Sequence, residues 1–173
     1  MKDPDHKGPL DVLGSIYENM YEDSADAFQK AENKTESTLH KIIDEAGELM
    51  SDAQELSREQ VDEISEYVKR DISDAAHYLS DTGKELSDWL GFELELLESK
   101  VVERLLGAVD SSTLSLLKLK EYAQKPIEFH TGQVTGPGVL ECDECGNQLH
   151  YYKAGRIPPC AKCHKTNFHR VMK

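Results

Sequence analysis

The sequence predicts a mainly α-helical chain, arranged as a long antiparallel helical hairpin or bundle, that ends in a small β unit. Three observations lead to this fold class. Apolar residues recur at three- and four-residue spacing from Leu10 to Leu119, which is the period of one face of an α-helix. Glycines cluster at residues 132–138, after Pro126. All four cysteines lie between Cys142 and Cys163.

These observations divide the 173 residues into four parts. Residues 1–8 are polar and are expected to form a disordered lead. Residues 9–125 are expected to form an acidic helical bundle that resembles a coiled coil. Residues 126–138 form a glycine-rich joint, and residues 139–173 form a cysteine-bearing ribbon.

The first helical pattern begins at Pro9 and continues more weakly to Ala31. The polar segment 32–37 interrupts it, and the pattern leaves open whether residues 9–56 form one helix or two. Both patterns place apolar residues on one face. These residues are Leu10, Leu13, Ile16, Tyr17, Met20 and Tyr21 before the interruption, and Leu39, Ile42, Ile43, Ala46, Leu49, Met50, Ala53 and Leu56 after it.

Ser57 and Gln60 match a capping box, in which a hydroxyl and an amide three residues later satisfy the first backbone groups of a helix. The helix that follows is expected to end near Gly83. The apolar residues of this helix fall on one seam, formed by Val61, Ile64, Val68, Ile72, Ala75 and Leu79.

Another helix is expected after Gly83, and a last helical piece around residues 114–119 is stopped by Pro126. The seam of the longer helix comprises Leu86, Leu90, Leu94, Leu97, Val101, Leu105 and Ala108. One stripe per helix is buried only if the helices pack on one another, so we expect a hairpin or three-helix bundle. A homo-oligomer formed through these helices is a further expectation.

The cysteines form two C-x-x-C pairs, Cys142 with Cys145 and Cys160 with Cys163, separated by fourteen residues. This spacing is typical of a β-ribbon folded around one tetrahedral metal ion, and four thiolates favour structural Zn²⁺. Gly146 supplies the backbone freedom that the first turn needs, and His164 stands in the equivalent place of the second. Residues 166–171 are expected to form a closing strand anchored by Phe168.

Other chemistries of these cysteines are less favoured. The same sulfurs can hold iron and carry electrons, as in a rubredoxin-like protein, and this alternative stays open. The C-x-x-C-H match at Cys160 to His164 would mean covalent haem, which needs export, and the N-terminus lacks an apolar signal core. The same lack of a signal disfavours two disulfides. A redox-active C-x-x-C is expected near a βαβ pattern, which the sequence does not show.

The net charge of −13 is unevenly placed. Residues 126–173 carry six Lys/Arg and four Asp/Glu, for +2, while residues 1–125 carry fourteen against 29, for −15. Residues 1–125 should therefore repel nucleic acids and anionic membranes. No apolar run has the length of a membrane span, so a cytoplasmic protein is expected.

The favoured function is a non-enzymatic protein-interaction or regulatory module with an unidentified protein partner, because no nucleophile, base and oxyanion donor converge in the sequence. The alternative is nucleic-acid binding by the ribbon, where cations are interleaved with aromatic residues. Its candidate contacts are Lys153, Arg156, Lys162, Lys165 and Arg170. His130, beside the glycine-rich joint, is a further candidate site residue.

The chain resembles the YbeL-like bacterial zinc-ribbon proteins most densely at residues 56–64, 68–72 and 130–163. The resemblance implies that Cys142, Cys145, Cys160 and Cys163 are the zinc ligands, and it implies no activity. Two positions depart from the family pattern. The family usually has glycine where His164 stands and an acidic residue where Gln133 stands.

Overall fold

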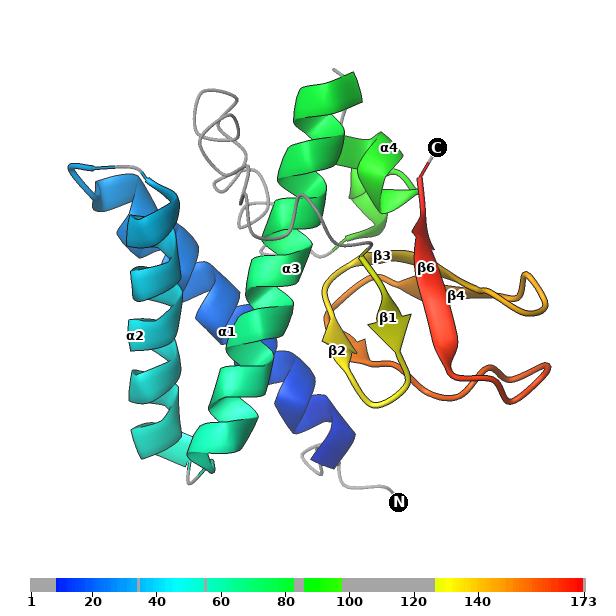
Figure 1. Ribbon diagram of the computed structural model, residues 1–173, viewed down its shortest axis with the longest axis horizontal. Coiled ribbons are helices and arrows are strands. Elements are labelled where there is room, and N and C mark those ends of the chain that lie inside the picture. The colour runs from blue at the N-terminus through cyan, green and yellow to red at the C-terminus, as the bar shows by residue number, and fades with distance from the viewer. Residues whose placement is uncertain (1–8, 34, 55, 83–85, 98–126, 173) are drawn as a thin grey trace.

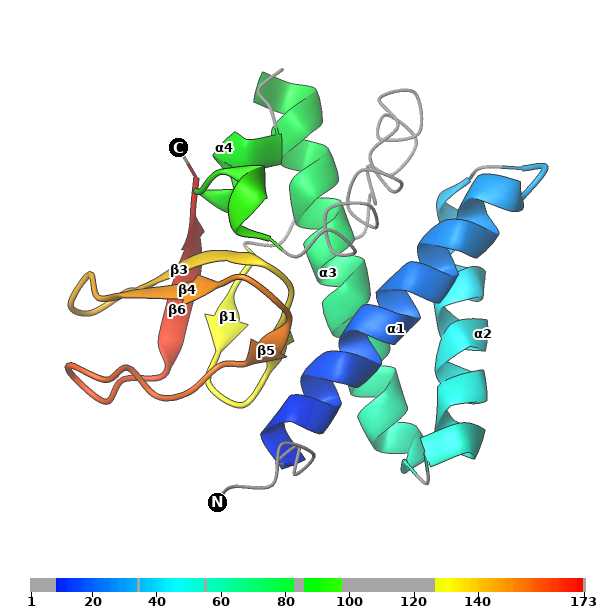
Figure 2. The ribbon, with the colours of Figure 1, turned by 180° about the vertical axis from the view of Figure 1, so that it is seen from behind.

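A computed structural model of the chain describes residues 9–33, 35–54, 56–82, 86–97 and 127–172. Its N-terminal half is helical, and its C-terminal part forms two small antiparallel sheets (Figure 1). Helices α1 (Pro9–Lys30), α2 (Glu36–Gln54) and α3 (Arg58–Thr82) pack on one another. Helix α2 lies on the side away from the sheets, whereas α1 and α3 contact them (Figures 1 and 2).

Residues 9–56 form two helices, which answers the question that the sequence left open. Helix α2 begins after Thr35, whose Oγ1 accepts a hydrogen bond from the Thr38 N–H (3.2 Å). The capping box at the start of α3 is confirmed. The Gln60 N–H donates to Ser57 Oγ (3.3 Å), and the Ser57 N–H donates to Gln60 Oε1 (3.1 Å). Each cap satisfies backbone donors that the first helical turn leaves unpaired.

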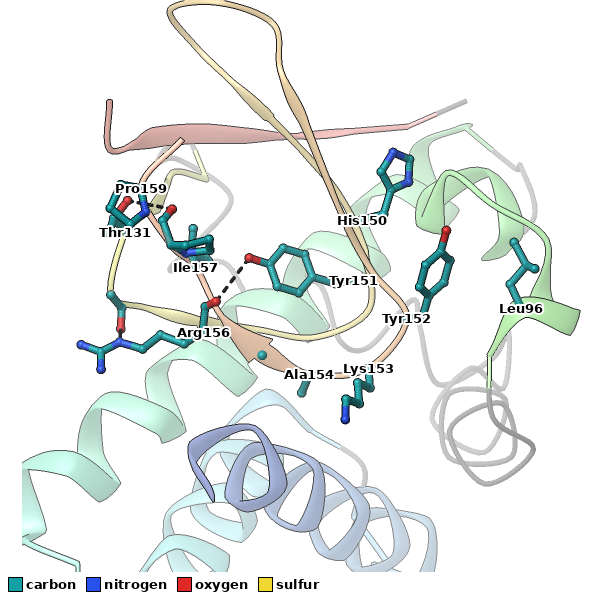
Figure 3. Close-up of a pocket in the computed structure, with 13 residues that line it drawn as sticks. Leu96, Thr131, His150, Tyr151, Tyr152, Lys153, Ala154, Arg156, Ile157 and Pro159 are labelled. Carbon is teal, nitrogen blue, oxygen red and sulfur yellow. Dashed lines mark hydrogen bonds between the residues drawn. The ribbon is translucent and has the colours of Figure 1, made fainter. Parts of the chain in front are cut away.

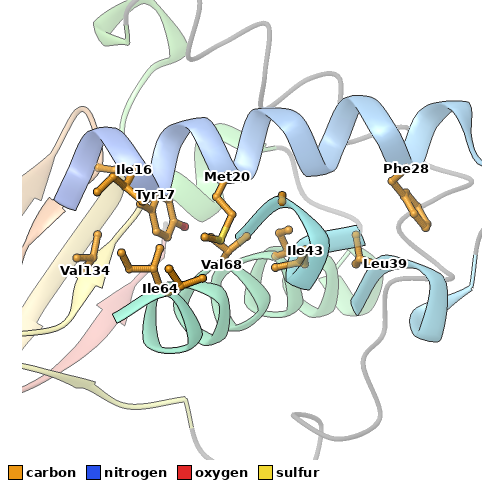
Figure 4. Close-up of a cluster of buried hydrophobic side chains, with 13 residues drawn as sticks. Ile16, Tyr17, Met20, Phe28, Leu39, Ile43, Ile64, Val68 and Val134 are labelled. Atoms are coloured by element: carbon orange, nitrogen blue, oxygen red, sulfur yellow. The ribbon is translucent and has the colours of Figure 1, made fainter. Parts of the chain in front are cut away.

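Most of the described residues of the stripes expected on the three helices meet in one core (Figure 4). Leu49, which was expected on the apolar face of α2, is instead 73% exposed. Its fully buried members include Ile16, Met20, Ile43 and Val68, and Val134 of the sheets joins them. Gly47 lies so close to α3 that a Cβ there would come within 2.7 Å of the Val61 side chain. The core therefore joins the helices to one another and to the sheets.

The helix expected from Leu86 onward is wrong within residues 86–97. Helix α4 covers only Leu86–Leu90, and Gly91 ends it with a φ of 80°. A short 3-10 helix, η1, follows at Leu94–Leu96. Four apolar residues of this stretch are buried in a cluster with Val139 instead of along a helical seam, namely Trp89, Leu90, Phe92 and Leu97, whereas Leu96 is exposed. The rest of the expected seam and the last helical piece lie outside the described residues.

The larger sheet has the strand order β1-β6-β3-β4 and the smaller one pairs β2 with β5. The strands are β1 (Phe129–His130), β2 (Val134–Thr135), β3 (Gly138–Cys142), β4 (Gln148–Tyr151), β5 (Gly155–Arg156) and β6 (Asn167–Val171). In β3, Leu140 pairs with Leu149 of β4 and Arg170 of β6. Strands β1 and β2 fall within the segment expected to be a joint. The expected closing strand and its buried Phe168 are confirmed.

The helices and sheets are in close contact. A Cβ on Gly14 of α1 would lie 2.6 Å from the Ala154 carbonyl oxygen, so only glycine allows this approach. Nearby, the Ala154 N–H donates to Glu18 Oε1 (3.0 Å). None of the described helices has both the length and the hydropathy that crossing a membrane requires.

Candidate metal centre

The two C-x-x-C pairs form two similar turns. In the first, the Gly146 N–H donates to the Cys142 carbonyl (3.0 Å), and Gly146 has a φ of 69°. In the second, the His164 N–H donates to the Cys160 carbonyl (2.9 Å), and His164 has a φ of 61°. His164 therefore adopts the left-handed conformation that glycine adopts in the first turn. This is uncommon for a residue with a side chain, although histidine is enriched there.

The turns bring all four sulfurs together, with every pair within 4.8 Å. The Sγ atoms of Cys142 and Cys163 are 3.5 Å apart, as are those of Cys145 and Cys160. A tetrahedron with metal–sulfur bonds of about 2.3 Å has edges of about 3.8 Å. The sulfurs therefore fit one tetrahedral ion. Four protein ligands would leave no coordination position for water or substrate.

The sulfurs lie beside an apolar cluster. Cys142 and Cys160 are buried, and Cys145 and Cys163 are half-buried. Phe168, which the sequence predicted as the anchor of the closing strand, belongs to this cluster. The other members include Phe129, Leu140, Leu149, Tyr151 and Ile157. The backbone N–H groups of Cys163 and Lys162 lower the pKa of the Cys160 thiol to about 6. Despite hydrogen bonds from backbone N–H groups, burial and the neighbouring sulfurs instead raise the pKa of the Cys145 and Cys163 thiols. A thiolate thus forms first at Cys160, and a bound metal ion must displace the protons of the other thiols.

Arg170 is not a surface contact, which corrects the expectation that it binds nucleic acid. Its side chain is only 2% exposed, and its Nε lies 2.9 Å from Asp74 Oδ2. Its Nη1 donates to the Pro137 carbonyl (3.0 Å), and its guanidinium lies 4.1 Å from the centroid of the Trp89 ring. Arg170 therefore holds β6 against α3 and α4.

A second buried pair, Arg70 and Asp71 on α3, was not expected from the sequence. Arg70 Nε donates to Asp71 Oδ1 (2.9 Å), and Arg70 Nη2 donates to the Val134 carbonyl (2.9 Å). Asp71 Oδ2 accepts hydrogen bonds from the Tyr17 hydroxyl (2.6 Å) and the Gly136 N–H (2.9 Å). These bonds join α1, α3 and the segment before β3.

In this network the pKa values of Asp71 and Asp74 are shifted in opposite directions. Burial favours a higher pKa for Asp71, but Arg70 and Arg170 together lower it below its ordinary value. For Asp74 burial prevails, so its pKa is raised although Arg170 lies beside it. Arg70 Nη1 also donates to Gln133 Oε1 (3.0 Å), which ties α3 to the segment between β1 and β2.

The glycine-rich segment owes its composition to this network. Gly138 has a φ of 148°, and a Cβ there would overlap Arg170 Nη1. A Cβ on Gly136 would lie 2.8 Å from the Tyr17 hydroxyl. Both glycines therefore make room for buried polar side chains.

The other predicted nucleic-acid contacts occupy two places. Lys153 and Arg156 line a groove of about 830 Å³ (Figure 3). Lys162 and Lys165 are exposed in and after the second cysteine turn.

His130, the remaining candidate, bonds through Nδ1 to Asn167 Oδ1 (3.0 Å), and its Nε2 lies 3.3 Å from Glu128 Oε2. His130 therefore helps to join β1 to β6 and does not reach the cysteines' ligand cluster.

The sequence signals differ between these sites. Cysteine spacing alone identified the four sulfurs. Arg70, Asp71 and Asp74 were missed because helical periodicity marks apolar residues, whereas α3 is buried on consecutive positions from Val68 to Ala75. The sequence does show a run of charged residues at these positions. Their burial could be recognised only once the sheet that packs against α3 was known.

Comparison with known proteins identifies the family. A family model described as a zinc-ribbon containing domain matches residues 26–172. The chain is similar to the uncharacterized protein YbeL of Escherichia coli K12, with 26% identity over 135 residues, 78% of this chain and 83% of that protein. The YbeL proteins of E. coli O6:H1 and O157:H7 match to the same extent. No solved structure matches. The matched span contains all four clustered cysteines, and the chain therefore belongs to the YbeL-like family of zinc-ribbon containing domains.

Proposed function

We propose that the chain is a non-enzymatic interaction module in which one structural Zn²⁺ ion holds the ribbon and the folded surface binds a protein partner. The closed set of four sulfurs carries this proposal. A catalytic zinc usually keeps one position for water or substrate, whereas Cys142, Cys145, Cys160 and Cys163 would fill a tetrahedron.

The exposed surface supports a role in binding. Tyr152 and Leu96, which are 45% and 57% exposed, line the groove that also contains Arg156. Tyrosine and arginine are enriched in protein–protein interfaces. Leu49 on α2 is 73% exposed, and association through the helices would be one way to cover it. The partner could therefore be another protein or a second copy of the chain, which light scattering distinguishes.

The metal is tested first. Elemental analysis of the untagged chain should give one zinc per chain and a colourless protein. Cys160→Ser should lower the zinc content to well below half, because it removes one of four thiolates. The neighbouring exposed Ala161→Ser should retain the metal. Iron at the same stoichiometry, with the red colour of an oxidised iron tetrathiolate, would favour the electron-carrier alternative and contradict the zinc assignment.

The interaction role is tested by cross-linking in cells with the intact chain and with Cys160→Ser. We expect a reproducible partner whose cross-links are lost when the ribbon loses its metal. Recovery of no partner under several growth conditions would contradict the proposal.

Nucleic-acid binding is less well supported. Arg170 is buried, so four of the five expected cations remain at the surface. Glu18 lies at one border of the groove, where its carboxylate accepts a hydrogen bond from the N–H of the lining residue Ala154. A long polyanion that followed the groove would pass this carboxylate as well as Lys153 and Arg156, and like charges repel.

A further inference from the structure

The groove lies on the ribbon, between the β4–β5 segment and the turn at Thr131 and Gly132. The Tyr151 ring points toward Arg156, whereas the His150 and Tyr152 rings lie on the side toward Leu96 (Figure 3). The Tyr152 ring packs against Phe92, with ring centroids 5.0 Å apart. The groove therefore offers aromatic surfaces that the protein itself holds in place.

The charge of the groove differs from that of the whole chain. Lys153 and Arg156 line it, and no aspartate or glutamate is among the described residues that do so. The chain as a whole carries −13. Arg156 Nε donates to the Gly132 carbonyl (3.2 Å), which fixes the direction of the guanidinium. The groove is thus complementary to a small number of negative charges.

A strand edge with which no second described strand pairs borders the same groove. Strand β4 is the last in the order β1-β6-β3-β4, and among the described strands it pairs only with β3. His150 and Tyr151 belong both to β4 and to the groove lining. An exposed edge can accept an extended peptide as an additional strand, with main-chain hydrogen bonds for affinity and side-chain pockets for specificity.

These features favour an acidic peptide over a nucleic acid or a second copy of the chain as the occupant of the groove. A short peptide can place one or two carboxylates at Lys153 and Arg156 without continuing past Glu18. A second copy of the chain, joined through the same edge by two-fold symmetry, would bring the same two cations toward each other.

We propose that this groove binds an extended acidic polypeptide segment of a partner protein. The segment adds to the edge of β4, places a carboxylate near Lys153, near Arg156 or near each of them, and packs an apolar or aromatic side chain on the tyrosines. This inference rests on the proposed interaction function, because it names the surface and the chemistry of the partner.

The test begins with selection of random twelve-residue peptides on the zinc-loaded full chain. Enriched peptides should contain Asp or Glu beside aromatic or apolar residues. In NMR titration of the full chain with one synthesised peptide, amide shifts should concentrate at residues 148–157. Failure to enrich any peptide, enrichment without acidic residues, or shifts elsewhere would overturn the inference.

Two sets of variants make the test specific. The double variant Lys153→Glu and Arg156→Glu should weaken peptide binding at least tenfold. The matched double variant Lys30→Glu and Lys41→Glu changes the same charge at exposed positions of α1 and α2, outside the groove, and should weaken peptide binding less than threefold. Zinc content and circular dichroism establish that each variant is folded. Equal losses of peptide affinity in the two double variants would indicate a general charge effect and would contradict binding in the groove.

The strand geometry is tested on the peptide. Successive backbone N–H groups of a strand point to opposite sides, so N-methylation should weaken binding at least tenfold at one set of alternate positions and little at the other. Uniform tolerance would overturn strand addition. A twelve-nucleotide RNA that produces the same shifts more tightly would assign the groove to nucleic acid, and a dimer through β4 would assign it to a second copy.

These outcomes separate the groove from the broader proposal. A cellular partner that cross-links away from residues 148–157 would leave the interaction function standing while the groove inference fails. Absence of both a partner and a peptide would contradict both.

Discussion

At the scale of single residues, Arg170 shows why a basic residue in a ribbon cannot be assigned to the surface from sequence. It lies among aromatic residues, a pattern also typical of nucleic-acid contacts. In the structure its guanidinium lies beside Trp89 and Phe129 and pairs with Asp74. Alternation along β6 places it on a buried face, but that face is covered only because α3 and α4 pack there.

Replacement of Arg170 by methionine should lower the free energy of unfolding by about 3 to 5 kcal/mol, because it leaves Asp71 and Asp74 buried without this cation. Urea unfolding of zinc-loaded protein measures the loss. Arg170→Lys should give an intermediate loss, since a single ammonium cannot reproduce the contacts to both Pro137 and Asp74. A loss no larger than that of the exposed Lys165→Met would contradict this account.

Replacement of Tyr17 by phenylalanine should cost about 2 kcal/mol at pH 7, because the hydroxyl donates to a buried carboxylate. Burial, and then the charge of Asp71, raise the pKa of Tyr17 above its ordinary value. The stabilisation linked to the raised pKa is therefore fully present below pH about 10 and is lost as the pH rises further.

The pKa of Asp71 is shifted in the opposite direction, because it is lowered in the folded chain. The stability that ionised Asp71 contributes is therefore present above pH about 4 and is lost as the pH falls further. Acid also releases thiolate-bound metal, so the alkaline range gives the cleaner measurement. Unfolding at pH 7, 9 and 11 should show the difference between Tyr17→Phe and the natural chain shrinking at pH 11. The exposed Tyr152→Phe serves as control, and a difference independent of pH would refute the assignment.

At the scale of elements, the helices that could be predicted are those whose apolar period and caps agree. Helix α3 has both, and it begins directly after Ser57. Helix α2 has the period, but the cap at Thr35 was not recognised in the sequence, so its separation from α1 stayed open. Within the described residues 86–97 the apolar period continues, but the helix ends at Leu90. Gly91 breaks it, and Trp89, Leu90 and Phe92 are buried beside β3. Periodicity alone cannot tell a helical seam from a short helix covering a sheet.

The cap of α3 gives a test at this scale. Ser57→Ala should lower the free energy of unfolding by about 1 kcal/mol, because the Gln60 N–H loses its acceptor. Chemical denaturation of zinc-loaded protein measures it. Ser37→Ala, an exposed substitution in the first turn of α2, should cost less than half as much. Equal costs would show that the box adds nothing.

The strands divide in the same way. Residues 166–171 could be predicted because they follow the second cysteine pair and carry Phe168. Strands β1 and β2 have two residues each and lie in a glycine-containing segment, so no alternating pattern is long enough to identify them. Their pairing depends on Phe168 and Arg156, which are more than 20 residues away. The four sulfurs needed no such knowledge, because each C-x-x-C pair is a local motif.

At the scale of the whole molecule, the metal centre and the helices are joined by β6. This strand follows the second cysteine turn and carries Arg170 to Asp74 on α3. The single tryptophan of the chain, Trp89, lies against Arg170 and donates from Nε1 to Asp74 Oδ2 (3.1 Å). The tryptophan is therefore a natural probe of whether loss of metal reaches the helices.

Removal of the metal with a chelator should shift Trp89 fluorescence and lower the helical circular dichroism signal together, because the ribbon supports one side of α3. Cys160→Ser should show the same spectra without chelator, and Ala161→Ser should match the natural chain. Metal loss that leaves Trp89 emission unchanged would show that the two parts are independent. Re-addition of zinc should restore both signals.

The crowding at Gly138 has one more consequence. Neighbouring strands can slip by one residue, which turns every side chain to the opposite face. Any such slip of β3 would push the ring of Pro137 or the branched side chain of Val139 into the space now filled by the Arg170 guanidinium. Cys142 is four residues further along the same strand. Gly138, at the start of β3, therefore fixes the register of this strand and with it the position of Cys142 at its other end.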